Sequence, residues 1–142
     1  MMRVIIDTNV ILDALLPDGE RPQGDRRSAQ LILDAVSQRT VVGLLSSVVF
    51  SELVHVGKPR RTDRVQVAQS FEYLLDICES TPITADTYRT AMASSFADVN
   101  DAAIFFAASR PDAIITRDGK DYRDHVNVPV YTATQFVKHF LK

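Results

Sequence analysis

Four short segments of the chain each place an acidic side chain beside small or apolar residues, and the four acids are Asp7, Glu52, Asp101 and Asp118. Carboxylates held within about 4 to 6 Å of one another repel and raise each other's pKa unless a cation neutralises them. Mg²⁺ and Mn²⁺ prefer hard oxygen ligands and retain bound water. Such an ion lowers the pKa of that water and neutralises charge on a phosphate, as phosphodiester hydrolysis requires. If the four acids meet, they predict a site for one or two divalent ions.

Each acid also has a structural interpretation when it is taken alone. Asp7 can cap the helix that follows it, Glu52 can lie on an exposed helix face, and Asp118 can belong to an Asp-Gly turn. Asp98 fits a helix cap better than a metal ligand, whereas Asp101, beside a very apolar helix, needs a partner if it is buried. The combination of acids indicates a site, and no single acid does so.

The elements that must position these acids can be recognised from apolar runs and turn residues. Residues 4–6 are typical of a buried strand and residues 10–16 of the helix after it, so Asp7 lies at the carboxyl end of a strand. Apolar spacing, capping residues and β-branched composition place the later elements. Further helices are expected at 28–37, from Ser46 or Ser47 onward, and at 63–78, 84–96 and 98–109, and further strands at 40–45, 113–116 and 128–131.

Strands separated by helices imply a mostly parallel sheet covered on both faces, which is a three-layer α/β/α sandwich. The carboxyl ends of parallel strands lie along one edge, and chemistry in open α/β sheets is found there. Asp7 and Asp118 can therefore be neighbours although they are far apart in the sequence. Glu52 and Asp101, near the starts of following helices, can reach the same edge.

Composition limits the class of protein. A chain of 142 residues that is 46% hydrophobic fits a single domain over residues 1–142. No apolar run approaches the roughly 20 residues of a membrane span, and no signal peptide is recognisable, so we expect a soluble, cytoplasmic protein. The only cysteine, Cys78, excludes an internal disulfide and a thiolate metal site. The formal charge of −2 provides no overall attraction for nucleic acid.

At these motifs the chain closely resembles the PIN-domain family of ribonucleases, which includes VapC-type toxins of bacterial toxin–antitoxin systems. The resemblance covers nearly the whole chain and rests on four segments, namely Val-Ile-Ile-Asp7-Thr8-Asn9-Val10, Ser51-Glu52-Leu53, Asp98-Val-Asn-Asp101-Ala-Ala-Ile, and Ile-Ile-Thr116-Arg117-Asp118-Gly-Lys-Asp121-Tyr122 with Val-Pro-Val-Tyr131 after it.

The resemblance implies a site as well as a fold. By position, the family's metal-binding acids fall on Asp7, Glu52, Asp101 and Asp118, with Asp98 and Asp121 as further candidates. Thr8, Asn9 and Thr116 resemble the small polar residues that orient ligands or water. The family implies RNA cleavage that depends on Mg²⁺ or Mn²⁺, a homodimer, and an antitoxin protein as partner.

Basic residues offer candidate contacts for RNA or for an antitoxin. Lys58, Arg60, Arg61 and Arg64 follow the helix of Glu52, where they either form a solvated helix end or clamp RNA phosphate or an acidic antitoxin segment. Arg117 either contacts substrate phosphate or lies exposed on the surface.

Two other functions compete with the nuclease. A phosphatase of the haloacid-dehalogenase type also begins with an Asp after the first strand, but it needs a second Asp where this chain has Asn9. A PIN-like protein that has lost activity could serve as an RNA-binding or scaffold protein. The presence of all four acids argues against that alternative.

Overall fold

The computed structural model describes residues 1–15, 23–57 and 64–141 of the chain. Within them, five strands form one parallel sheet in the order β3-β2-β1-β4-β5. The strands are β1 (Arg3–Ile6), β2 (Val42–Ser46), β3 (Glu79–Thr81), β4 (Ala113–Ile115) and β5 (Val130–Tyr131). The central strand β1 aligns Ile5 with Leu44 of β2 and Ile6 with Ile115 of β4.

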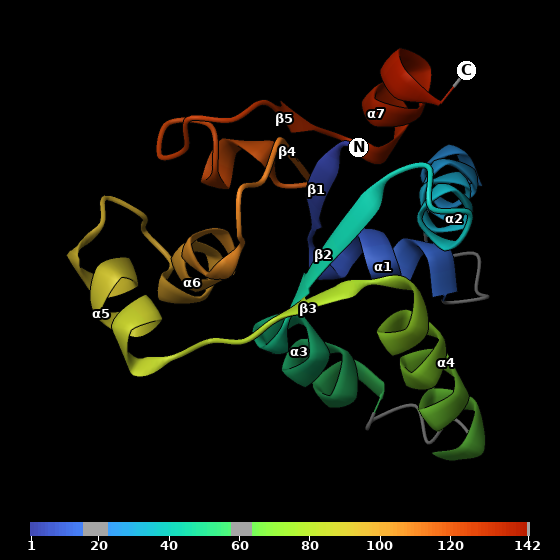
Figure 1. Cartoon of the computed structure of the whole chain (residues 1–142), viewed down its shortest axis with the longest axis horizontal. Helices are drawn as coiled ribbons and strands as arrows, with labels where there is room; N and C mark the ends of the chain where they lie inside the picture. Colours follow the sequence, from blue (N-terminus) through green and yellow to red (C-terminus); the bar gives the residue numbers. More distant parts are fainter. Residues whose placement is uncertain (16–22, 58–63, 142) are drawn as a thin grey trace.

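Helices flank this sheet on both sides. They are α1 (Thr8–Leu15), α2 (Gln23–Ser37), α3 (Ser47–Gly57), α4 (Arg64–Ile77), α5 (Ala85–Ala93), α6 (Val99–Ala107) and α7 (Ala133–Phe140), with a short 3₁₀ turn η1 (Gly119–Asp121). Helix α2 packs against α1 and α7, whereas α5 and α6 pair with each other across the sheet from α2 (Figure 1). The expected α/β/α architecture with a parallel sheet is confirmed.

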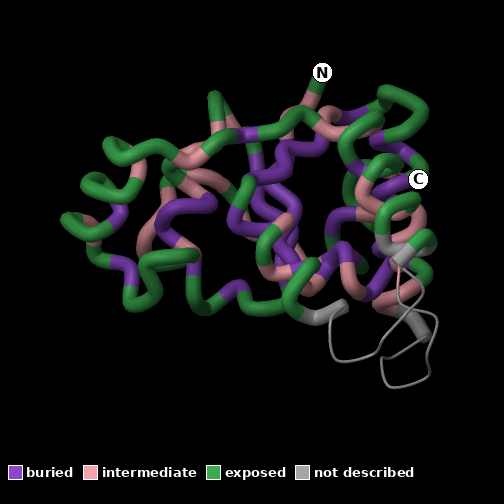
Figure 2. Tube along the Cα trace, turned by 90° about the horizontal axis from the view of Figure 1, so that it is seen from below, coloured by how far each residue is buried: buried purple, intermediate pink, exposed green. Residues whose placement is uncertain are grey.

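The core lies where the central strands meet the helices. Ile6, Leu45 and Ile114 are completely buried, and the buried part of the trace runs through the middle of the molecule (Figure 2). Parallel strands that are covered on both faces consist of nearly continuous apolar residues, as β1 and β4 do here. A rigid sheet edge is therefore available to position side chains that follow these strands.

Several expected helix starts are confirmed by their capping bonds. The Thr84 hydroxyl accepts from the backbone N–H of Thr87 at the start of α5, and an Asp98 carboxylate oxygen accepts from two N–H groups at the start of α6. The Ser46 hydroxyl accepts from Val49 N at the start of α3. The apolar helix α6 is buried at Ala102, Ala103 and Ile104, whereas Phe106 is 37% exposed.

Strand β3 was not predicted. Its residues Glu79, Ser80 and Thr81 have no apolar run, and two of the three are exposed. They form a strand because they pair with the end of β2, and that pairing is a tertiary interaction with no local signal in the sequence. Among the described residues, none of the helices is both long and apolar enough to cross a membrane.

A close approach between β2 and α2 leads to a stability prediction. A Cβ atom at Gly43 would lie 3.1 Å from Ile6 Cδ1 and 3.2 Å from both Val36 methyl carbons. Because a packed core yields only at a cost, we expect Gly43→Ala to lower the free energy of unfolding by about 1–2 kcal/mol in urea denaturation. The matched control is Gly119→Ala, where the new methyl meets only the movable end of Arg123. Equal stability of the two variants would contradict this prediction.

Candidate active site

The site is built where β1 and β4 end side by side. Asp7 follows β1, and its backbone N–H donates to the carbonyl oxygen of Ile115, the last residue of β4, at 3.0 Å. The Thr116 hydroxyl, one residue further on, donates to Asp7 Oδ2 at 2.8 Å. Residues 109 positions apart are thus joined by the parallel pairing of the two strands.

Asp7 is the most enclosed acid of the site, with 7% of its surface exposed. Burial raises the pKa of its carboxyl, while hydrogen bonds from Thr116 and from Thr8 N lower it, and the charges of Asp118 and Asp121 raise it again. The bond from Thr8 N to Asp7 Oδ1 is 2.9 Å long. Asp7 therefore stabilises the start of α1, as a capping residue does, and also presents a buried carboxylate to other acids.

Glu52 approaches this point from α3. Burial is the main cause that raises the pKa of its half-buried carboxyl, and the charges of Asp7 and Asp98 add to the effect. The Thr8 side chain lies close enough to Glu52 to lower this pKa. The Thr8 hydroxyl is nevertheless buried and completes no well-formed hydrogen bond within the described part of the chain. The Thr8 hydroxyl, next to Asp7 and close to Glu52, can therefore form a further hydrogen bond.

Asp101 approaches from α6. Burial, followed by the charges of Asp7, Asp98 and Asp121, raises the pKa of Asp101 to about 7. The hydroxyl of fully buried Tyr122 donates to Asp101 Oδ1 at 3.4 Å, which opposes part of that increase. Asp98, the cap of α6, is itself exposed.

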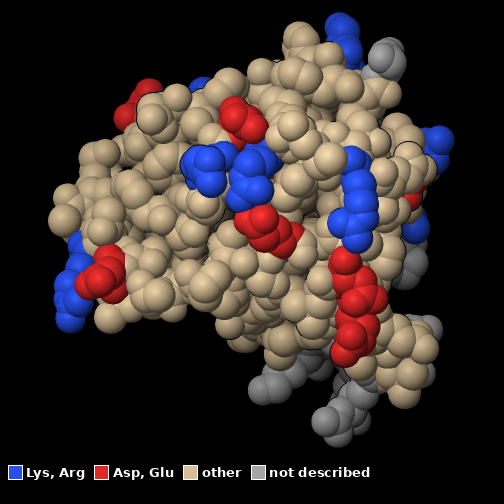
Figure 3. All heavy atoms as spheres, viewed as in Figure 1, with Lys and Arg blue, Asp and Glu red and all other residues tan. Residues whose placement is uncertain are grey.

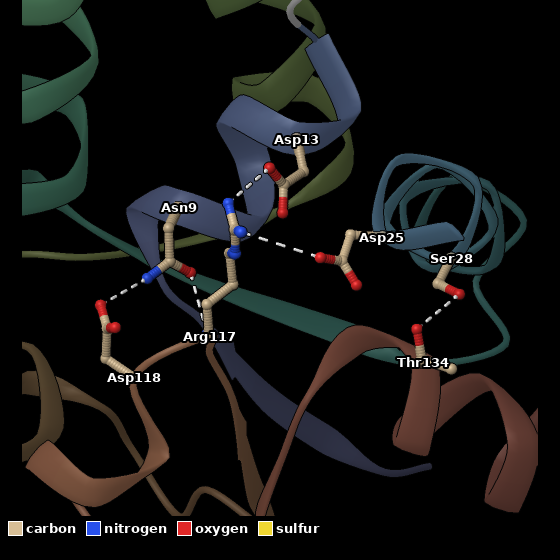
Figure 4. Close-up of polar contacts among 7 residues, drawn as sticks. All are labelled: Asn9, Asp13, Asp25, Ser28, Arg117, Asp118 and Thr134. Carbon is tan, nitrogen blue, oxygen red and sulfur yellow. Dashed lines mark hydrogen bonds and ion pairs between the residues drawn. The ribbon is translucent and has the colours of Figure 1, made fainter. Parts of the chain in front are cut away.

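Asp118 is exposed on the loop after β4, and its carboxylate is oriented by Asn9. Asn9 Nδ2 donates to Asp118 Oδ2 at 3.1 Å, and Asn9 Oδ1 accepts from the backbone N–H of Arg117 at 3.1 Å (Figure 4). The backbone N–H of Asp118 donates to the Thr116 hydroxyl at 3.1 Å. Asn9 and Thr116, both expected as polar helpers, thus organise this loop.

The predicted acids therefore influence the charge state of one another through Asp7. Asp7 has an electrostatic interaction with Glu52, with Asp101 and with Asp118, and the flanking acids Asp98 and Asp121 act on the same group of carboxyls. Over residues 1–15, 23–57 and 64–141, no three acidic, His or Cys side chains already form a cluster that could hold a metal ion. The acids share one edge of the sheet as an open group and not as a closed cage, and their role as ligands stays a prediction.

Of the basic residues that were expected to contact RNA or an antitoxin, the structure describes the side chain of Arg117 alone. Lys58, Arg60 and Arg61 lie outside the described residues, and Arg64 begins α4 with a side chain that is also outside them. On the face shown in Figure 3, the described Lys and Arg side chains stand in separate small groups among Asp and Glu. Arg117 forms ion pairs with Asp13 at 3.3 Å and Asp25 at 3.8 Å.

Two residues gained importance only in the structure. Asp13 was not among the predicted site residues, but its side chain is 1% exposed and binds Arg117. Tyr122 reaches Asp101 through its hydroxyl. A tyrosine next to an acidic motif gives no sign of which way it points, so only packing reveals this contact.

The fold gives the class of the protein, and comparison with known proteins gives its family. The fold and the acidic edge define an α/β protein with its polar residues at the carboxyl ends of parallel strands. The sequence profile of the PIN domain matches residues 3–120. The chain belongs to the PIN-domain family, and the matched region contains the four acids around Asp7.

The fold is also similar to that of a solved structure. A chain in the crystal structure of VapBC2 from Rickettsia felis bound to a DNA fragment from their promoter matches with a TM-score of 0.62. The two chains are 16% identical over 91% of this chain and 97% of that one, a likeness that shows a shared fold. No curated protein sequence matches this chain.

Proposed function

We propose that this protein is a metal-dependent endoribonuclease and the toxin of a toxin–antitoxin pair. The observation that carries the proposal is the electrostatic interaction of Glu52, Asp101 and Asp118 with the buried Asp7 in a chain of the PIN-domain family. These four residues would hold Mg²⁺ or Mn²⁺, with Asp98 and Asp121 at the margin.

The donor set fits such an ion. All the candidate ligands are carboxylate oxygens, which Mg²⁺ and Mn²⁺ prefer over sulfur or imidazole. The raised pKa values of Asp7, Glu52 and Asp101 show that their negative charges are costly where they stand, and a cation would relieve that cost. The spare bonding capacity of the buried Thr8 hydroxyl suits an ordered water beside the carboxylates.

The residues of the chain then have separate tasks. Asp7 is fixed by two hydrogen bonds and supplies the rigid reference point, while Asn9 orients Asp118 and Tyr122 orients Asp101. A bound divalent ion supplies a water of lowered pKa and neutralises negative charge at the scissile phosphate. The carboxylates would align the attacking water with the phosphorus, opposite the 3′ oxygen, so that the new P–O bond forms as the bond from phosphorus to the leaving 3′ oxygen breaks.

Partners are part of the same proposal. The VapBC2 structure contains a toxin–antitoxin pair by its name, and we propose that this chain also binds an antitoxin. A homodimer is proposed with the exposed apolar side chains of α5 and α6 as its contact, where Tyr88, Met92 and Phe106 are 40%, 65% and 37% exposed. A cytoplasmic location follows from an RNA substrate and stays a prediction.

The direct test is cleavage of RNA by the purified protein. Total RNA is incubated with the protein and Mn²⁺, and newly formed ends are sequenced. We expect discrete new ends that disappear with a chelator and with Glu52→Gln, because Glu52 is one of the proposed ligands. The matched control is Glu72→Gln on an exposed part of α4, which should cleave as the wild type does. If the protein binds divalent ions but does not cleave RNA, or if it does neither, the result would favour a scaffold protein.

A further inference from the structure

The loop that carries Asp118 is anchored at two sides. On the side of Asp7, the Thr116 hydroxyl donates to Asp7 Oδ2 and accepts from Asp118 N. On the other side, Arg117 reaches toward α1 and α2 (Figure 4). The two anchors lie within three successive residues, so the direction of the Asp118 carboxylate depends on both.

Arg117 contacts two successive turns of α1. Its backbone N–H donates to Asn9 Oδ1 at 3.1 Å, and its Nη1 donates to Asp13 Oδ1 at 3.3 Å. Asn9 and Asp13 are four residues apart and therefore lie on the same face of the helix. One residue of the loop is thus bound to α1 through both its backbone and its side chain.

The guanidinium also joins α1 to α2. Its Nη2 lies 3.8 Å from Asp25 Oδ2, while Asp13, on the other nitrogen, is almost completely buried. A planar guanidinium can bind carboxylates on two different elements through different nitrogens, whereas a lysine ammonium is a single point of charge. Arginine therefore fits this position better than lysine.

We propose that Arg117 is a positioning residue that sets the place of Asp118 relative to Asp7, and so determines how tightly the divalent ion is held. The chain of contacts runs from Asp13 and Asp25 through Arg117 to Asn9, whose amide nitrogen holds Asp118 Oδ2. Arg117 itself does not touch the ion or the RNA. This inference rests on the proposed metal-dependent nuclease.

The test is a double-mutant cycle on Mn²⁺ affinity, measured by calorimetry on the full chain. We expect Arg117→Met to weaken Mn²⁺ binding by about tenfold, the lower end of the effect of removing groups that orient metal ligands. Because Arg117 acts through Asp118, the double variant with Asp118→Asn should bind Mn²⁺ no more weakly than Asp118→Asn alone. Arg117→Lys should fall between the wild type and Arg117→Met.

Controls separate positioning from stability. Arg89→Met removes an arginine of an exposed ion pair with Asp86 on α5 and should leave Mn²⁺ affinity unchanged. Thermal melting identifies any variant that fails to fold. If Arg117→Met does not fold, Arg117→Lys and Asp25→Asn take its place in the cycle, because both leave α1 and its buried acid intact.

The other outcomes overturn the inference in different ways. An undiminished effect of Arg117→Met in the Asp118→Asn background would show that Arg117 does not act through Asp118. Unchanged Mn²⁺ affinity with weaker RNA binding would make Arg117 a phosphate contact instead. A wild type that neither binds Mn²⁺ nor cleaves RNA would remove the proposed function itself, whereas Mn²⁺ binding that only Asp118→Asn weakens would remove the positioning role alone.

Discussion

Asp7→Asn is expected to reduce Mn²⁺-dependent RNA cleavage by about 10³-fold or more, equivalent to about 4 kcal/mol of transition-state stabilisation. Asp7 is the acid that interacts with Glu52, Asp101 and Asp118 alike, so its charge is common to every part of the site. The amide retains the size of the carboxylate. Its oxygen can still accept from Thr8 N, and its NH2 group, in the place of Oδ2, can donate to the Thr116 hydroxyl oxygen instead of accepting from it. The fold should therefore survive while the site loses its central ligand.

The measurement is initial cleavage rate on one RNA substrate, together with the thermal melting temperature. Because burial disfavours the ionised form of Asp7, the metal-free variant should be at least as stable as the wild type. Asp86→Asn, on the exposed surface of α5, is the matched control and should retain the wild-type rate. Full activity of a folded Asp7→Asn protein would contradict the assignment of Asp7 as a ligand.

The second large effect concerns Asp101 and pH. The ordinary pKa of an aspartate, 3.8, describes this group in the unfolded chain, and folding raises it to about 7. Between these values the folded protein holds a proton that the unfolded chain has lost. The contribution of Asp101 to the free energy of unfolding therefore falls as pH rises from about 4 to 7, and the loss is complete above pH 7.

Comparison of Asp101→Asn with the wild type isolates this contribution. At pH 8 without metal, we expect the variant to be more stable by about 1–2 kcal/mol, a value reduced from the full shift because the carboxyl is only half-buried. Near pH 4 this advantage should disappear. Urea denaturation at the two pH values, with a chelator present, is the measurement.

Mn²⁺ should reverse the order of the two proteins. Binding of an ion to the folded state alone adds about 2.7 kcal/mol when its free concentration is 100 times the dissociation constant. The wild type should gain this stabilisation at pH 8 and lose affinity by up to about tenfold for each pH unit below 7, because Asp101 must release a proton to bind the ion. Equal responses of wild type and Asp101→Asn would show that Asp101 takes no part in metal binding.

The general location of the site was predictable because it depends on local pattern and one topological rule. An apolar run followed by Asp7, and another followed by Thr116 and Asp118, identify strand ends without any knowledge of the packing. Parallel strands then bring those ends to the same edge. Capping by Thr84 and Asp98 was equally local, since a hydroxyl or carboxylate needs only the next turn of backbone.

The contacts around the site could not be predicted in this way. Arg117 could have pointed into solvent, toward a phosphate or toward α1, because each direction is compatible with its place after β4. Asp13 gives no sign of burial in the sequence, because acidic residues usually lie exposed, yet its side chain is 1% exposed and paired with Arg117. Such contacts depend on how the helices pack on the sheet, and this packing cannot be predicted from a single sequence.

By itself, the sequence determined that the chain alternates strands and helices, that acids follow the strands, and that any metal they bind would have oxygen ligands, because these features follow from residue type and short-range spacing. Only the tertiary structure decided that Asp7 is buried while Asp118 is exposed, that β3 forms at all, and that Tyr122 and Arg117 hold the neighbouring carboxylates. The physical reason is that burial and side-chain direction depend on surfaces contributed by distant segments, which come together only when the chain folds.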